Sequence, residues 1–495
     1  MPAKSRPVRA PAGTAHQDGF SMERALSVGQ EALWFINRMA PDSSAYNVVY
    51  TIGLHHRLDV PALSRAVRLT AQRHDVLRSA FTEIDGMPRR VVREGGLLDL
   101  EVRDVGDVGE DVLTALVRTE VTRPFDLPSG APARLVLLRR GPDDALLVFV
   151  AHHIALDGPS QVLVLQDLLD AYQALREGGS PDWSPLKVTY DEFVTAERRL
   201  LDSPRAAALA AYWRELCEGA PTVLDLPTDR PRPGRQRLRG ATHVFQMPED
   251  IVAGLVPASR AHRTTPARYL IGLFQSLLHR YSGQRDFLIG CAATSTMGLN
   301  RLGVAGYFVN SIPLRTRCGP QVTFRELVAD ANEQLREGMA RVDYPSALLP
   351  KALGLPRASG TSGLFQVLAT TMTAGRQAPL FALAAGGHGT TVDYAGLRLS
   401  CFDVPQQEGQ FDVTLELVRD RTSIRCALKY DTDLFDPGTI ARLAVHYRLL
   451  IRAARDDPDA PVAGVALLDD TERARLLAFA TGRSDLTAAS YGGTR

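Results

Sequence analysis

Residues 149–161 read FVAHHIALDGPSQ, an apolar run that ends in two adjacent histidines and continues into an acid, a glycine and a serine. The apolar part predicts a buried strand, and the serine predicts the start of a helix. Successive side chains of a strand point to opposite faces, so only one of His152 and His153 can face a cavity. The stretch therefore predicts a strand, a turn and a helix that present one imidazole to a site.

The turn after the histidines carries two residues with distinct expected roles. Asp157 lies four residues after His153, and Gly158 removes any obstacle that a Cβ would form. We expect the acid to pair with an arginine and hold the turn rather than titrate. Ser160 is the expected helix cap, and the N–H groups at the positive end of that helix could stabilise an oxyanion.

An adjacent histidine pair is usually structural, and His55 and His56 form a second pair without an acid–glycine turn. The pair at 152–153 differs by the turn that follows it. The chain has no GxSxG nucleophile motif, so covalent catalysis is not indicated. Adjacent histidines on a strand cannot both bind one ion, and no metal is expected. The chemistry that fits is direct acyl transfer, in which an imidazole takes a proton from, or positions, an incoming amine or hydroxyl.

The composition is that of an ordinary globular protein. The 495 residues are 45% hydrophobic, and 57 basic residues nearly balance 56 acidic ones, so neither nucleic acid nor an anionic membrane is an expected partner. The five cysteines are dispersed and form no metal-binding pattern, as a reducing cytoplasm permits. No apolar run approaches the ~20 residues of a membrane span, and the first residues lack a secretory signal. A cytoplasmic location is expected.

Helical periodicity and strand-like alternation follow one another in both halves of the chain, which predicts an α/β protein with two lobes of similar build. We expect a disordered tail over 1–22, a first lobe over 23–185, a second lobe over 186–470 and a linker or tail over 471–495. Residues 59–81 are predicted as one amphipathic helix, with an aspartate cap and a proline in the first turn.

The histidine stretch also carries a resemblance. HHIALDG has the HHxxxDG form of the chloramphenicol acetyltransferase-like acyltransferases. Further segments, in the same order over nearly the whole chain, resemble the condensation domains of nonribosomal peptide synthetases. These segments are LSVGQEALWFI (26–36), RHDVLRSAF (73–81), YDEFV (190–194), GVAGYFVNSIPLR (303–315) and the late stretches LFQVL, FDVTLEL and YDTDLFD.

The resemblance implies a V-shaped pseudo-dimer of two acetyltransferase-like lobes with the active site at their junction. His153 matches the family's catalytic histidine and His152 its structural neighbour. Asp157 matches the acid that bonds an arginine, and Arg78 and Arg315 are the candidate partners.

The resemblance also implies two tunnels that bring in substrates on phosphopantetheine arms, with no bound cofactor and no metal. Gly158 matches the glycine that gives the substrate room. The family usually has a bulky residue at the position of Pro159 and a methionine at that of Ala151, so the substrate shape is expected to be unusual. The candidate tunnel residues are Ala151, Pro159, Ser160, Tyr307, Asn310 and Ser311.

The implied function is amide bond formation between a carrier-bound acyl or aminoacyl thioester and an amine. The expected partners are donor and acceptor carrier proteins and neighbouring synthetase modules. An ester-forming or acyl-CoA-dependent transferase with a small soluble acceptor remains an alternative, as does a non-catalytic platform that recruits other enzymes. The intact histidines argue against a heterocyclising relative. Residues 461–484 resemble a linker that leads into an adenylation domain, so the chain is either excised from a synthetase or free-standing.

Overall fold

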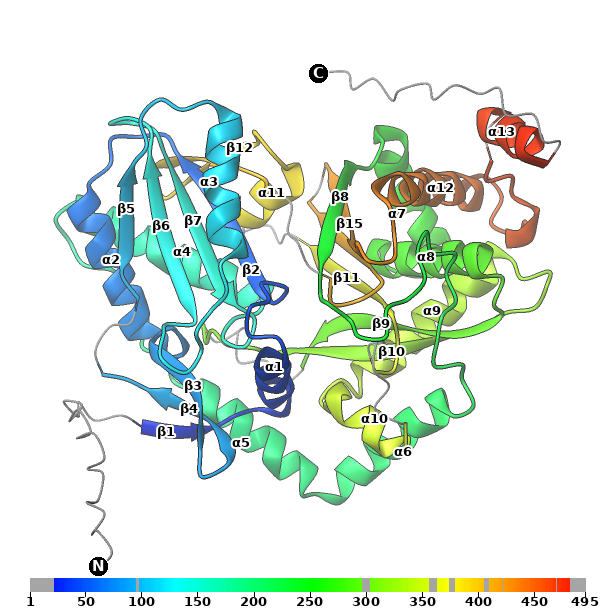
Figure 1. Cartoon of the computed structure of the whole chain (residues 1–495), viewed down its shortest axis with the longest axis horizontal. Coiled ribbons are helices and arrows are strands. Elements are labelled where there is room, and N and C mark those ends of the chain that lie inside the picture. The colour runs from blue at the N-terminus through cyan, green and yellow to red at the C-terminus, as the bar shows by residue number, and fades with distance from the viewer. Residues whose placement is uncertain are drawn as a thin grey trace, which may run out of the picture.

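Each lobe of the molecule is built around one sheet, and the two lobes stand side by side and diverge toward one edge (Figure 1). The computed structural model describes residues 22–94, 98–295, 303–355, 363–373, 379–404, 409–420, 422–468 and 470–480. Over these residues each lobe has a six-stranded sheet, and a three-stranded sheet of order β1-β4-β3 adjoins the first lobe.

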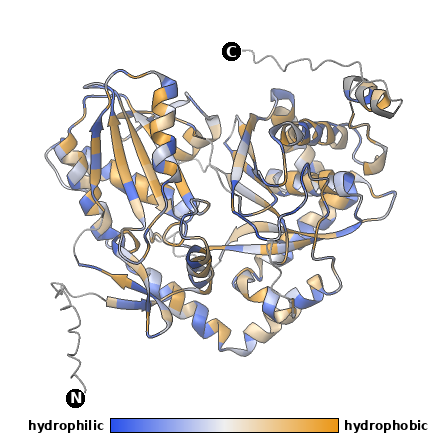
Figure 2. Ribbon diagram, viewed as in Figure 1, coloured by the Kyte–Doolittle hydropathy of each residue, from blue (hydrophilic) through white to orange (hydrophobic). Residues whose placement is uncertain are grey.

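The sheet of the first lobe has the spatial order β12-β13-β2-β7-β6-β5. Its strands are β12 (Thr391–Tyr394), β13 (Leu397–Cys401), β2 (Asn47–Leu54), β7 (Ala145–His152), β6 (Ala133–Arg139) and β5 (Leu100–Asp104). Every residue of β7 is buried, as expected for a central strand covered on both faces. Figure 2 shows β6 and β7 as almost continuously hydrophobic. In Figure 1, α3 (Glu110–Thr122) lies in front of this sheet and α4 (Gly158–Arg176) behind it.

The predicted helix over 59–81 is shorter in the structure. The helix α2 (Val60–Arg73) ends before a short 3-10 turn, Asp75–Arg78, and the chain then enters β3 (Ser79–Ile84). A tight turn joins β3 to β4 (Met87–Val92), and both of its residues, Asp85 and Gly86, have positive φ. An Asp-Gly pair is a strong hairpin signal, and strand pairing overrides the helical pattern of the residues before it.

The sheet of the second lobe has the order β10-β9-β11-β14-β15-β8. Its strands are β10 (Val309–Arg317), β9 (Asp286–Thr294), β11 (Val367–Thr373), β14 (Val413–Arg419), β15 (Ile424–Asp431) and β8 (Gly240–Gln246). Four helices pack with this lobe: α7 (Glu249–Ala261), α8 (Pro266–Ser282), α9 (Phe324–Met339) and α12 (Pro437–Asp456). They lie beyond the sheet on the side away from the first lobe (Figure 1).

The remaining elements connect the lobes or line their edges. They are β1 (Met22–Ala25), α1 (Val28–Met39), α5 (Tyr190–Leu201), α6 (Pro204–Cys217), η3 (Ser346–Leu348), α10 (Leu349–Ala352), α11 (Pro379–Gly386), η4 (Val462–Gly464) and α13 (Asp470–Ala480). None of the helices in the described part of the chain combines the length and apolar character that a membrane span requires.

The predicted division at residue 185 does not separate the two hydrophobic cores. β12 and β13, from the second half of the chain, extend the sheet of the first lobe, with β13 paired to β2. The core of the first lobe also includes Phe193 of α5 and Phe308 before β10. The lobes are therefore interleaved along the chain. Most of the expected tails, residues 1–21 and 481–495, lies outside the described residues.

Candidate active site

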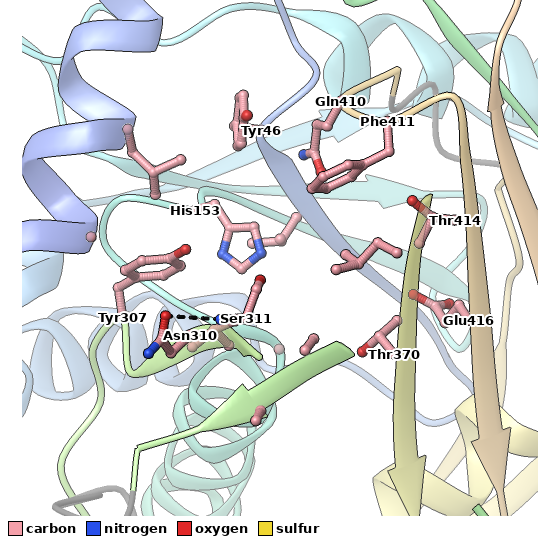
Figure 3. Close-up of a pocket in the computed structure, with 18 of the residues that line it drawn as sticks. Tyr46, His153, Tyr307, Asn310, Ser311, Thr370, Gln410, Phe411, Thr414 and Glu416 are labelled. Carbon is pink, nitrogen blue, oxygen red and sulfur yellow. Dashed lines mark hydrogen bonds between the residues drawn. The ribbon is translucent and has the colours of Figure 1, made fainter. Parts of the chain in front are cut away.

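A cavity of about 1180 Å³ lies between the lobes and is lined by both of them. The first lobe contributes residues of α1 and β2, and the second contributes residues of β9, β10, β11, β14 and β15. Figure 3 shows His153 in the middle, with Tyr307 and Asn310 on one side and Thr414 and Glu416 on the other. This is the junction at which the resemblance places the active site.

His153 directly follows the last residue of β7 and lines the cavity. Its N–H donates to the carbonyl oxygen of Tyr46 at 2.8 Å, and its Nδ1 bonds the carbonyl oxygen of Leu156 at 3.0 Å. A carbonyl can only accept, so Nδ1 carries the proton and Nε2 keeps its lone pair. The ring meets that of Tyr307 edge-on, with 5.3 Å between centroids. Burial lowers the pKa of His153 to about 4; the bond to Leu156 opposes this shift and the charge of Lys429 adds to it.

His152 is buried away from the cavity. Its Nδ1 accepts a hydrogen bond of 3.1 Å from the N–H of Ile154, and its ring packs near those of Tyr46 and Phe125. Burial, with a smaller effect of His153, lowers the pKa of His152 to about 3. The strand end therefore separates the pair into one packed imidazole and one that faces the cavity, as the alternation predicts.

Asp157 is fully buried and ties two segments together through backbone amides. It is the N-cap of α4, where its Oδ1 accepts from the N–H of Ser160 at 2.8 Å. Its Oδ2 accepts from the N–H of Phe308 at 3.0 Å, and its own N–H donates to the carbonyl of Gly306 at 3.0 Å. One carboxylate thus joins the start of α4 to the segment that leads into β10.

The prediction that Asp157 pairs with Arg78 or Arg315 is wrong. Arg78 donates to two backbone carbonyl groups, at 3.0 and 2.5 Å. Arg315 forms a two-point ion pair with Asp286, at 2.7 and 2.6 Å. Both arginines bond other partners. The carboxylate of Asp157 instead accepts hydrogen bonds from peptide N–H groups, which take the place of the expected arginine.

The helix start also differs from the prediction. Asp157, not Ser160, caps α4, and the Ser160 N–H is engaged by that cap. Ser160 is buried, and its hydroxyl accepts from the N–H of Gly306 at 3.2 Å. The Ser160 N–H is therefore not directed at a substrate oxyanion. Gly158 does line the cavity, and a Cβ built on it would make an ordinary 3.5 Å contact with the sulfur of Met372.

The candidate tunnel residues separate into two groups. Pro159, Tyr307, Asn310 and Ser311 line the cavity, whereas Ala151 and Ser160 do not. Ala151 lies inside the sheet, paired with residues of both β2 and β6, and is fully buried. Its expected role in substrate shape is therefore wrong.

Asn310 has a structural task as well as a place in the cavity wall. Its side-chain nitrogen donates to the carbonyls of Val342 and Tyr344, both at 2.7 Å. Its oxygen accepts from the N–H groups of Ser311 and Ser346, both at 2.9 Å, and the first of these bonds is drawn in Figure 3. The amide therefore holds the start of β10 against the segment around η3.

Several cavity residues were missed in the sequence. Gln410 and Phe411 lie above His153 in Figure 3, and Thr414 and Glu416 project from β14. The FDVTLEL stretch, which contributes to the family resemblance, contains both of these strand residues. Its polar residues at every second position, on a strand otherwise apolar, place Thr414 and Glu416 on one face, and that alternation was the available signal.

The chemistry available at the centre is that of one neutral imidazole. Within the described ranges, no three His, Cys, Asp or Glu side chains form a group that could hold a metal ion. The cavity is large enough to hold a substrate of drug-like size or more, since such sites commonly measure about 300–1,000 Å³. The arrangement can bring two reactants together and can accept one hydrogen bond from either at the Nε2 of His153.

Known proteins resemble this chain over nearly its whole length. The profile of the Condensation domain family matches residues 21–477. A linear gramicidin synthase of Brevibacillus parabrevis is 32% identical over 458 residues, which are 91% of this chain. The chain spans only 6% of the length of that relative.

Solved structures share the fold. A four-domain nonribosomal peptide synthetase bound to AMP and glycine matches 93% of this chain with a TM-score of 0.83 at 23% identity, over 35% of its own chain. The first condensation domain of the calcium-dependent antibiotic synthetase, in complex with a substrate analogue, matches 90% of this chain and 99% of its own with a TM-score of 0.76 at 22% identity. The predicted α/β fold of two acetyltransferase-like lobes is confirmed.

Proposed function

Because the chain belongs to the condensation-domain family of nonribosomal peptide synthetases, we propose that it forms an amide bond between a carrier-bound acyl or aminoacyl thioester and an amine. The observation that carries the proposal is the neutral His153, with its Nε2 lone pair, in the cavity between the lobes. Both substrates reach it on the phosphopantetheine arms of carrier proteins from neighbouring modules.

The reaction exchanges one bond for another at the donor carbonyl. The amine nitrogen attacks the thioester carbon, a C–N bond forms, and the C–S bond breaks. The pantetheine sulfur leaves with the electron pair and takes up one proton, while the attacking nitrogen loses one. His153 accepts the hydrogen bond of that N–H at Nε2 and directs the nitrogen lone pair at the carbonyl.

The low pKa of His153 favours a role in positioning the amine over a role as the base that takes up its proton. An ordinary α-amine has a pKa near ~8, whereas that of His153 is about 4, so proton transfer from an ammonium to this imidazole would be uphill by roughly 5 kcal/mol. The proton that the nitrogen loses is therefore better passed on to the departing sulfur than kept on the ring. The bond to Leu156 supports this role because it holds the ring and its tautomer in place.

The test is intact-protein mass spectrometry of two carrier domains, one loaded with an aminoacyl thioester and the other with an amine-bearing residue. We expect mass to move from donor to acceptor with the wild type, and His153→Ala to lower the rate about 10²–10⁴-fold. His55→Ala is the matched control, because His55 belongs to the other histidine pair and does not line the cavity.

The alternatives give different outcomes. Transfer to a free amine or alcohol, with none between carriers, would favour an acyltransferase with a soluble acceptor. A folded His153→Ala variant with wild-type turnover would remove the assigned role of the imidazole. The absence of transfer to any acceptor would contradict amide bond formation and favour a recruitment platform.

A further inference from the structure

A group of polar and charged side chains, most of them from the second sheet, lines one side of the cavity. Thr370 of β11, Thr414 and Glu416 of β14, and Arg425 and Lys429 of β15 all line it. Register places Thr370 opposite Glu416 and Thr414 opposite Lys429, so these side chains share one face of the second sheet. Together with Asp403, which follows β13 and also lines the cavity, they form a group that we call the polar wall.

The charges of the polar wall are paired with one another. Lys429 Nζ lies 3.0 Å from Glu416 Oε2, and Arg425 NH1 lies 3.9 Å from Glu416 Oε1. The Nε of Arg425 donates to Asp403 Oδ2 at 3.1 Å, and a second guanidinium nitrogen contacts the same carboxylate. The side chains of Lys429 and Arg425 are only 10% and 11% exposed. Two cations and two anions thus form a network inside the cavity.

The carboxylate of Glu416 stays ionised in this setting. Burial alone would raise its pKa, but the charges of Lys429 and Arg425 outweigh that effect and the net shift is downward. Glu416 stands beside Thr370 and Thr414 on one side of His153 (Figure 3). The wall therefore presents hydrogen-bond donors and acceptors together with no net charge from its four ionised groups.

We propose that the polar wall selects a substrate whose side chain both donates and accepts hydrogen bonds, such as a carboxamide, over an aliphatic group of the same length. This inference rests on the proposed function and specifies its substrate class. A side chain of this kind can donate to a carboxylate or hydroxyl of the wall and accept from one of its cations or hydroxyls. An aliphatic group would displace water from the charged network without replacing its hydrogen bonds, which is unfavourable.

The experiment compares glutamine with norleucine, whose side chain has similar length and no polar atom. One arm varies the donor residue against a fixed glycine acceptor, and the other varies the acceptor against a fixed acetyl donor, with alanine as the short reference in both. We expect kcat/KM to favour glutamine by at least tenfold in the arm whose side chain meets the wall, since sites built for hydrogen bonding reject analogues that lack it. The arm without a preference for glutamine then identifies the substrate, donor or acceptor, whose side chain does not contact the wall.

The double variant Glu416→Leu with Lys429→Met removes the central ion pair at similar volume, a change that is often neutral for stability. We expect it to reverse the preference toward norleucine. Glu416→Gln with Lys429→Gln, which keeps hydrogen bonding without charge, should still favour glutamine. The control replaces Glu333 and Arg336, an exposed pair on α9, by Leu and Met, and should leave the ratio unchanged.

Binding is measured separately from catalysis with non-hydrolysable pantetheine amides of glutamine and norleucine, by calorimetry on each folded protein. Tighter binding of the glutamine amide by the wild type, lost in the Leu/Met variant, supports the inference even without turnover. Equal or weaker binding of the glutamine amide overturns it. Transfer of alanine at a normal rate with no preference for glutamine in either arm also overturns it, and leaves the proposed function intact.

Discussion

His153 and Asp157 occupy the same turn but are held by opposite kinds of contact. The ring of His153 donates to one carbonyl and leaves its second nitrogen toward the cavity. Asp157 faces inward and uses both carboxylate oxygens on peptide N–H groups. The cavity-facing side chain and the buried carboxylate are thus four residues apart, because the strand ends at His152 and the turn follows it.

The ionisation of His153 gives a prediction at this scale. Its pKa is about 4 in the folded protein and near 6.5 when exposed, so between those values an unfolded chain binds a proton that the folded one does not. This contribution to the free energy of unfolding is complete above pH 6.5 and is lost as the pH falls toward 4. An NMR titration of the ring should have its midpoint near pH 4. In urea denaturation, the free energy of unfolding of His153→Gln should fall less between pH 7 and pH 5 than that of the wild type. An NMR midpoint near pH 6.5 would contradict the assigned burial of the ring.

The role of Asp157 gives a second prediction. Asp157→Ala leaves the buried N–H groups of Ser160 and Phe308 without their acceptor and should lower the free energy of unfolding by about 2–6 kcal/mol, at about 1–3 kcal/mol for each group. Urea denaturation measures the change. In a double-mutant cycle, Asp157→Ala and Arg315→Met should be additive, whereas Asp286→Ala and Arg315→Met should show coupling. Measurable coupling between Asp157 and Arg315 would instead support the ion pair that the family resemblance implies.

The orientation of the two histidines was predictable because it depends only on local strand geometry. The alternation of His152 and His153 follows from strand geometry alone. The partner of Asp157 was not predictable, because its carboxylate bonds Phe308, about 150 residues further along the chain, and nothing near either residue marks that meeting. The same holds for Ala151, which the family resemblance placed beside a substrate and which the flanking strands enclose.

At the scale of elements, one glycine explains how the 303–315 segment approaches the first lobe. A Cβ on Gly306 would lie 2.1 Å from the ring of Tyr190 on α5, closer than real contacts allow. Tyr190 in turn donates its hydroxyl to the carbonyl of Tyr307 at 2.8 Å. The close approach brings Tyr307 against His153 and allows the N–H of Phe308 to reach Asp157.

The crossing strands give a third prediction. Leu399 of β13 is fully buried in the core of the first lobe and pairs with Leu54 of β2. Leu399→Ala should lower the free energy of unfolding by about 2–5 kcal/mol, the usual loss for a core leucine, although it lies in the second half of the chain. Urea denaturation measures the loss, and hydrogen exchange should show faster opening of β2. Val445→Ala, at a half-exposed position on α12, is the control and should change stability by less than about 0.5 kcal/mol. An unaffected β2 would contradict the shared core.

Elements were predictable where their pattern is local and strong. The strand before the histidines is a continuous apolar run of the kind that a strand buried on both faces requires, and the sequence shows it directly. The helix predicted over 59–81 was wrong at its end because β3 becomes a strand only through its pairing with β4. Strand propensity depends on such partners more than helix propensity does.

At the scale of the whole molecule, the cavity depends on contacts that cross between the lobes. Gln410 donates to the carbonyl of Ala45 at 2.6 Å, and the Arg425 side chain of β15 reaches Asp403 beside β13. His153 comes from one lobe and Glu416 from the other, so the relative position of the sheets sets which side chains share the cavity. The polar wall and the imidazole therefore line one cavity only because both lobes are held in this relative position.

The sequence by itself determined the α/β class, the strand that ends in His152, the turn that presents His153, and the resemblance to the condensation family, because each rests on local periodicity or on a motif in order along the chain. Only the tertiary structure decided that β12 and β13 join the first sheet, that Asp157 accepts from backbone amides, and that Glu416, Arg425 and Lys429 line the cavity. These facts depend on which distant segments pack together. That choice is made by the burial of surface over the whole chain, which leaves no local mark on any one of its segments.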